Sequence, residues 1–155
     1  MAQRGLSLIE LVIALAILGV LAAAILPMAE VTMTRTKEIE LRRSLRTIRM
    51  AIDQYKEDHD RAEDEKKIIT SVDETGYPES LDELLKGTDW GGLFAYQKKY
   101  LRRIPRDPFD TYDEGWGLRS LEDEADSTVW GGDNVFDVYS QSDAIGLDGT
   151  AYNTW

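Results

Sequence analysis

An uncharged stretch near the N-terminus constrains this chain more than any other feature of its sequence. Residues 11–29 contain no Asp, Glu, Lys or Arg, and Leu6, Leu8 and Ile9 extend the apolar run on its N-terminal side. A helix of about 20 predominantly apolar residues is long enough to cross the hydrocarbon core of a bilayer. The stretch is therefore predicted to form a membrane-inserted helix.

A secretory signal peptide is the alternative explanation, because Arg4 precedes the stretch and small residues lie at 22–24. Two features argue against it: the run is longer than the usual core of about 7–15 residues, and Glu10 lies inside it. An ionised carboxylate in hydrocarbon costs at least a few kcal/mol and needs a partner, unless it reaches the membrane surface about 7 Å away. Glu10 is therefore a candidate functional residue.

Residues 4–11, Arg-Gly-Leu-Ser-Leu-Ile-Glu-Leu, resemble the processing motif of type IV pilins and of the pseudopilins of type II secretion systems. The resemblance implies that a prepilin peptidase cuts after Gly5 and methylates the new N-terminus at Leu6, where the family usually has phenylalanine. It also implies that Glu10 pairs with the N-terminal amine of a neighbouring subunit in a helical homopolymer.

The resemblance also divides the chain into parts. It implies a leader peptide at residues 1–5, a transmembrane and polymerisation helix at 6–29, and a periplasmic head at 30–155 that includes the second half of the long helix. Gly19 and Pro27 fall where the family places residues that loosen the helix. Basic residues lie on both sides of the span, so charge alone does not decide its orientation. The resemblance implies a single pass through the bacterial inner membrane, with a cytoplasmic N-terminus.

Helical spacing of apolar residues continues beyond the span. No glycine or proline occurs from Thr32 to Tyr55. Charged residues at 56–61 are predicted to form a solvated helix end or loop after about Asp58, with His59 exposed. Apolar residues recur at intervals of three and four and form a stripe along one face: Leu41, Leu45, Ile48, Ile52 and Tyr55. This spacing predicts an amphipathic helix that packs the stripe on the head.

The rest of the chain has the signals of a small mixed head. Residues 77–85 are predicted to form a short helix that ends at Gly87, and strands are predicted at 115–118 and 135–139. The fold class expected is α+β, a long N-terminal α-helix packed on a small antiparallel β-sheet. The core near the strands is predicted to contain Trp116, Trp130, Phe136 and Tyr139.

The tail at 136–150 resembles the C-terminal loop of major, G-type pseudopilins, in which an Asp-Val/Ile-Tyr-Ser strand opens into a calcium-binding turn. The resemblance implies Asp143 and Asp148 as ligands of Ca²⁺, with Ser140 and Ser142, and calcium takes six to eight oxygen ligands. The loop is shorter than in the family and has fewer glycines. The alternative is that both aspartates are turn formers, with Asp148-Gly149 making a tight turn.

Charge and composition exclude several function classes. The net charge of −11, from 29 acidic and 18 basic residues, disfavours a nucleic-acid partner. The chain has no cysteine, and it has no P-loop, dinucleotide-binding glycine pattern or histidine pair for zinc. A membrane-tethered enzyme is therefore disfavoured, and the chain is predicted to be structural.

The function implied by the resemblance is that of a subunit of a periplasmic pseudopilus that helps drive protein export through a type II secretion system. Its partners would be other copies of itself, the prepilin peptidase, minor pseudopilins, the inner-membrane assembly platform and the lipid bilayer. The alternative is a type IV pilin-like subunit of a surface fibre for adhesion, motility or DNA uptake. The lack of cysteine argues against the usual type IV pilin, whose tail is commonly closed by a disulfide.

Overall fold

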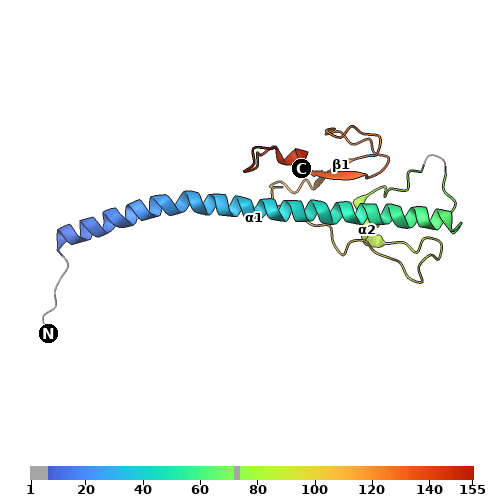
Figure 1. Cartoon of the computed structure of the whole chain (residues 1–155), viewed down its shortest axis with the longest axis horizontal. Coiled ribbons are helices and arrows are strands. Elements are labelled where there is room, and N and C mark those ends of the chain that lie inside the picture. Colours follow the sequence, from blue (N-terminus) through green and yellow to red (C-terminus); the bar gives the residue numbers. More distant parts are fainter. Residues whose placement is uncertain (1–6, 72–73) are drawn as a thin grey trace. The chain divides into compact units, whose positions relative to one another are not determined.

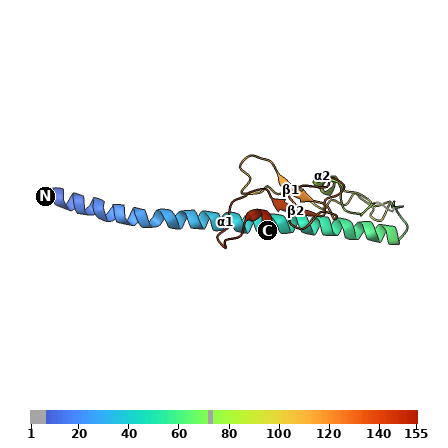
Figure 2. The same cartoon turned by 90° about the horizontal axis from the view of Figure 1, so that it is seen from above.

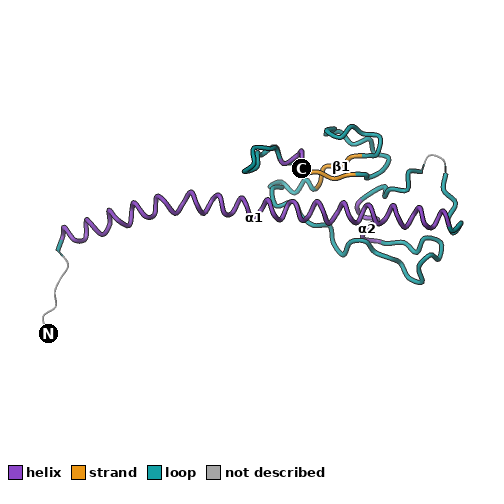
Figure 3. The backbone as a smooth tube through the Cα atoms, viewed as in Figure 1, coloured by secondary structure: helices purple, strands orange, loops and turns teal. Residues whose placement is uncertain are grey.

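The computed structural model describes residues 7–71 and 74–155 and has the expected α+β composition (Figure 1). Figure 3 shows that much of the chain outside the long helix is loop. The predicted class, a long N-terminal helix with a small antiparallel sheet, is confirmed. The elements in chain order are α1 (Leu8–Asp64), α2 (Leu81–Lys86), β1 (Trp116–Arg119), β2 (Asp137–Ser140) and the 3₁₀ helix η1 (Tyr152–Thr154).

The first part of α1 belongs to a compact unit, Met1–Thr36, that is separate from the unit Lys37–Trp155. The apolar side chains that the structure describes in this unit are exposed, and an 18-residue window of α1 has a mean hydropathy of 2.8 with no residue buried. By length and composition this helix can cross a membrane as a single pass. The backbone is helical through Gly19 and Pro27, so neither residue interrupts α1, and the loosening remains a prediction.

The second unit has one hydrophobic core, which lies against the predicted stripe of α1. Figure 2 shows the two strands beside this part of the helix. Val138 of β2 is fully buried, and α2 contributes Leu84. The stripe is confirmed, because its members are buried in this core: Leu41, Leu45, Ile48 and Ile52, with Tyr55 partly buried beside them.

The far end of α1 differs from the prediction. The helix continues to Asp64, and His59 is only 7% exposed, so the prediction of an exposed histidine in a solvated run was wrong. The reason is tertiary: the ring of Trp90 packs edge-on to His59 at 5.4 Å, and Gly76 lies so close that a Cβ there would be 2.5 Å from the imidazole Nδ1. A run of charges indicates exposure only where no other segment packs on it.

The two strands pair antiparallel, with Trp116 opposite Ser140 and Arg119 opposite Asp137. Each strand begins one or two residues later than predicted. Both faces of β2 are covered: Val138 faces the core, whereas the ring of Tyr139 lies over Gly117, where a Cβ would be 2.3 Å from the ring. Burial on both faces hides the alternation that the strand prediction depends on.

The predicted aromatic core is half right. Trp116 and Tyr139 are buried, but Trp130 and Phe136 are 38% and 41% exposed. Trp130 instead donates its indole N–H to the backbone oxygen of Asn134 at 2.8 Å and holds a loop at the surface. The predicted short helix at 77–85 is present, but it begins only at Leu81. Its end is as predicted, because α2 stops at Lys86 and Gly87 follows with a positive φ of 78°.

Candidate functional site

The first turn of α1 contains the candidate assembly residue Glu10. Ser7 Oγ accepts a hydrogen bond from the backbone N–H of Glu10 at 3.3 Å, and Ser7 O accepts one from the N–H of Leu11 at 3.1 Å. Ser7 thus caps the helix, and Ser-x-x-Glu is the spacing of a capping box. This role of Ser7 was not predicted, although the Ser-x-x-Glu spacing in the sequence indicates it.

Glu10 is exposed, and within the two described ranges no side chain pairs with its carboxylate. It is the acidic residue of the first turn, where the helix dipole favours negative charge. The predicted cleavage residues Gly5 and Leu6 lie outside the described residues, so the processing site stays a prediction. At Gly19 an added Cβ would meet nothing within 4 Å, which shows that this face of the helix is open.

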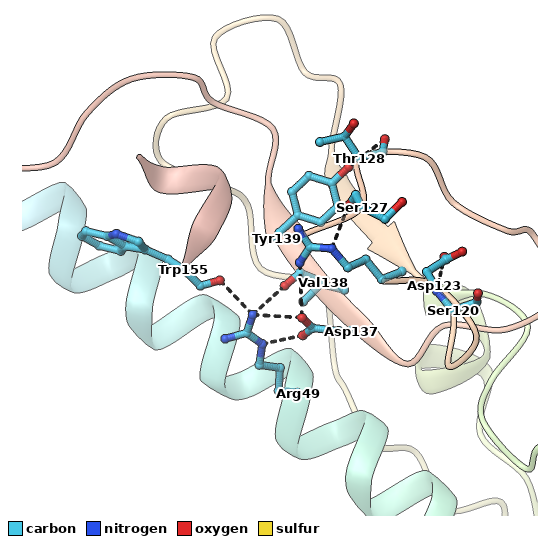
Figure 4. Close-up of polar contacts among 10 residues, drawn as sticks. Arg49, Ser120, Asp123, Ser127, Thr128, Asp137, Val138, Tyr139 and Trp155 are labelled. Carbon is cyan, nitrogen blue, oxygen red and sulfur yellow. Dashed lines mark hydrogen bonds and ion pairs between the residues drawn. The ribbon is translucent and has the colours of Figure 1, made fainter. Parts of the chain in front are cut away.

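Arg49 is the main polar link between α1 and the sheet (Figure 4). Its Nε donates to Asp137 Oδ1 at 2.6 Å, and its Nη2 lies 3.3 Å from Asp137 Oδ2. The same Nη2 donates to the backbone oxygens of Val138 at 3.0 Å and Trp155 at 2.8 Å. A forked, charge-assisted contact of this kind fixes geometry as well as adding energy. It ties the helix to both β2 and the last residues.

A second arginine, Arg119 of β1, links the two strands to the loop that follows β1. Arg119 Nη1 lies 3.5 Å from Asp137 Oδ2, its Nε donates to the backbone oxygen of Ser127 at 2.8 Å, and its guanidinium is 4.1 Å from the centroid of the Tyr139 ring. The Tyr139 hydroxyl donates to the backbone oxygen of Thr128 at 3.2 Å (Figure 4). The acidic loop after β1 therefore covers the face of the sheet on which Tyr139 lies.

Glu38 performs a similar role near the start of the second unit. Its Oε1 accepts the backbone N–H of Leu147 at 2.7 Å and the hydroxyl of Tyr152 at 3.1 Å. Burial and the contact with Glu38 raise the pKa of Tyr152 to about 12. The contacts of Glu38 and Arg49 were not predicted, because each is a charged helix residue whose partner lies far along the chain.

The predicted calcium ligands are engaged by groups of the chain itself. Asp148 Oδ1 accepts the N–H of Thr150 at 3.0 Å and its hydroxyl at 2.6 Å, and Asp148 Oδ2 pairs with Arg42 at 3.0 Å. Asp143 Oδ1 lies 3.4 Å from the amide nitrogen of Asn153. The Thr150 hydrogen bonds lower the pKa of Asp148.

The two predicted serine ligands are also part of local turns. Ser140 Oγ accepts the N–H of Ser142 at 3.2 Å, and Ser142 Oγ accepts the N–H of Ala144 at 3.4 Å. The guanidinium of Arg42 beside Asp148 would repel a divalent cation. In this arrangement the four residues fit the turn hypothesis and do not fit a calcium site. Calcium binding by the chain is a separate property, and it is tested by melting the protein with calcium and with excess chelator.

Within the described ranges, His59, Asp60 and Glu63 place possible ligand atoms within 4.8 Å of one another. Lys56 already pairs with Asp60, and His59 Nδ1 lies 3.3 Å from the same carboxylate oxygen. The hydrogen bonds and charges of Lys56 and His59 lower the pKa of Asp60 against the opposing effect of burial. These contacts account for the cluster as the polar end of α1.

Comparison with known proteins identifies the N-terminal segment. Residues 1–26 match the family model described as the prokaryotic N-terminal methylation motif. No curated protein and no solved structure matches the chain. The motif indicates a type IV pilin-like protein, and it implies processing by a prepilin peptidase and pilin-like assembly. Proteins with this motif are structural rather than enzymatic.

Proposed function

We propose that this chain is a structural subunit of a periplasmic pseudopilus that helps drive protein export through a type II secretion system. The observation that carries the proposal is the methylation motif at residues 1–26, which includes the start of the exposed apolar helix α1 at Leu8. The lack of cysteine and the strand Asp-Val-Tyr-Ser at 137–140 support the secretion branch over a surface fibre.

Glu10 supplies the assembly contact in this proposal. Cleavage after Gly5 creates an amine at Leu6, close in depth to the carboxylate of Glu10. The described residues offer Glu10 no partner within its own chain, and an unpaired carboxylate in hydrocarbon is costly. The amine of a staggered neighbour satisfies it, so the pair selects both the register and the neighbour during polymerisation.

N-terminal sequencing of the mature protein tests the pathway. We expect the chain to begin at N-methylated Leu6. An uncut Met1, or a cut near Ala24, would refute the proposal, because the first leaves no new amine and the second removes the polymerisation segment.

Assembly is tested with a matched pair of variants. We expect Glu10→Ala, expressed at the wild-type level, to stay in the membrane and be lost from sedimented filaments. Glu30→Ala removes an exposed carboxylate further along α1 and is expected to assemble normally. Normal incorporation of the Glu10→Ala subunit would remove Glu10 from the mechanism.

Imaging at native expression separates the two machines. A secretion defect in a deletion strain that shows no surface fibres supports the pseudopilus. Long surface fibres that contain this chain would assign it instead to a type IV pilus-like fibre.

A further inference from the structure

A groove lies between the second half of α1 and the end of the chain. Its volume is about 560 Å³, within the range of about 300–1,000 Å³ for pockets that hold small ligands. Three arginines one helical turn apart give it a basic floor. The lining includes Arg42, Arg46, Arg49, Met50, Asp148 and Trp155.

The three arginines are not equivalent. Arg42 is bound to Asp148 and lies over the ring of Trp155 at 4.1 Å, and Arg49 is bound to Asp137. Arg46 is exposed and has no ion pair or hydrogen bond from its guanidinium to any described residue. Met50 beside it is 54% exposed. The groove thus offers one available cation next to apolar surface.

The acidic turn at residues 110–115 has the opposite character. The carboxylate of Asp110 accepts the N–H groups of Tyr112 and Glu114 at 3.1 Å each, and that of Gly115 at 2.8 Å. These bonds hold the turn in one conformation. Tyr112 is 84% exposed, and the exposed carboxylate of Glu114 has no ion pair among the described residues. In Figure 2 the segment that leads into β1 projects away from α1.

Charge along the chain favours a meeting of these two surfaces. Residues 107–155 contain 12 acidic residues and one basic residue, whereas residues 1–106 contain 17 of each. Within the groove, Arg46 is the cation that no described carboxylate pairs with, so its guanidinium is attracted to the acidic C-terminal third of another copy. Complementary charge of this kind fixes register and suppresses wrong partners.

We infer that the acidic turn of one subunit docks in the groove of a second copy of this chain, with Glu114 on Arg46 and Tyr112 against Met50. The turn and the groove are different surfaces, so the contact is heterologous and repeats into an open helical assembly. The preformed turn loses little conformational freedom on binding. The inference rests on the proposed function, since a filament places many copies side by side.

Disulfide trapping tests the contact in the full-length protein, which has no cysteine of its own. Two variants, Arg46→Cys and Glu114→Cys, are co-expressed and oxidised in membranes, and each is also oxidised alone, so that 46–46 and 114–114 dimers are told apart from the 46–114 crosslink. We expect a dimer from this pair. The control pairs Arg43→Cys with Glu114→Cys, because Arg43 is exposed on the same helix outside the groove. We expect no dimer from this control pair.

Charge reversal supplies an independent readout. Arg46→Glu and Glu114→Arg are each expected to lower the amount of subunit in sedimented filaments, and the double variant to restore it. Arg43→Glu is the control and should leave assembly unchanged. All the replaced side chains are exposed, and unchanged melting temperatures verify that the variants fold.

The possible outcomes separate this inference from the proposed function. Normal wild-type filaments without the 46–114 crosslink, or without rescue by the double variant, overturn the docking contact and leave the filament proposal standing. A crosslink from position 46 to a protein of another mass overturns the assignment to a second copy. A wild-type chain that is cut at Leu6 but never forms filaments overturns both.

Discussion

Arg49 donates four hydrogen bonds, and its acceptors are on β2 and at Trp155. Nε donates one of these bonds, and the two hydrogens of Nη2 are shared among the other three, so the contact needs two nitrogens of the planar fork. A lysine ammonium at the same position has a single nitrogen and cannot reach the same set. The sequence showed Arg49 only as one charge on the polar side of a helix, since its partner Asp137 is 88 residues away.

Replacement of Arg49 by lysine isolates the geometry from the charge. We expect Arg49→Lys to lower the free energy of unfolding by about 1–3 kcal/mol, because acceptors at Val138 and Trp155 lose their donor. The measurement is urea unfolding of the full-length chain in detergent, followed by tryptophan fluorescence. Arg43→Lys, on the same helix and exposed, should stay within about 0.5 kcal/mol of wild type. Equal effects of the two changes would show that the fork does not matter.

Three aspartates have carboxylates that accept hydrogen bonds fixing local turns. Each bond favours the ionised form, so the pKa of the carboxyl is below its ordinary value. The main donors are the N–H of Gly115 for Asp110, the N–H of Ser120 for Asp123 and the hydroxyl of Thr150 for Asp148.

These shifts predict acid sensitivity of the head. The unfolded chain holds aspartate pKa values of about 3.9, above those of the folded state, so it binds more protons as the pH falls. The stability that the ionised carboxylates contribute is fully present above about pH 5 and is lost on acidification below about pH 4. We expect the melting temperature to fall across that window, and Asp123→Asn to flatten part of the fall. Asp126→Asn, in the same loop and exposed, should leave the profile unchanged.

The stripe of α1 was predictable because helical spacing is a local property of the sequence. What covers the helix was not. Asp58 is buried because a segment 40 to 42 residues later folds onto it: Lys98 and the Tyr100 hydroxyl contact Asp58 Oδ2 at 2.5 and 2.6 Å. His59 is buried in the same way by Trp90. The boundaries of the strands were predicted only to within two residues, because four-residue strands that are buried on both faces show little alternation.

The stripe should respond to truncation as a packed core does. Ile48 is fully buried, and we expect Ile48→Ala to lower the free energy of unfolding by about 2–5 kcal/mol through lost apolar contact and the cavity left behind. Ile39→Ala makes the same change at an exposed position of the same helix and should stay within about 0.5 kcal/mol. Denaturant unfolding of both variants gives the comparison. Similar losses at the two positions would mean that Ile48 does not lie in the core.

At the scale of the whole molecule, the N-terminal motif could be predicted from the sequence, whereas the arrangement of the C-terminal tail could not. The predictions of processing at Gly5 and of assembly through Glu10 both depend on one short contiguous motif, so the sequence predicts them together. The arrangement of the tail depends on which side chains of α1 it meets. Arg42 pairs with Asp148, and this long-range contact favours the turn hypothesis over the calcium hypothesis, both of which the sequence left open.

The turn hypothesis and the calcium hypothesis therefore differ most in whether calcium stabilises the whole chain. A cation that binds only the folded state at 100 times its Kd adds about 2.7 kcal/mol of stability. Because Asp148 is already paired with Arg42 and bonded to Thr150, we expect the same melting midpoint with calcium and with excess chelator. Asp148→Asn should lower the midpoint equally in both solutions, since it weakens the turn and the ion pair. A midpoint that rises with calcium only when Asp148 is present would instead establish the cation site and require Arg42 to move away.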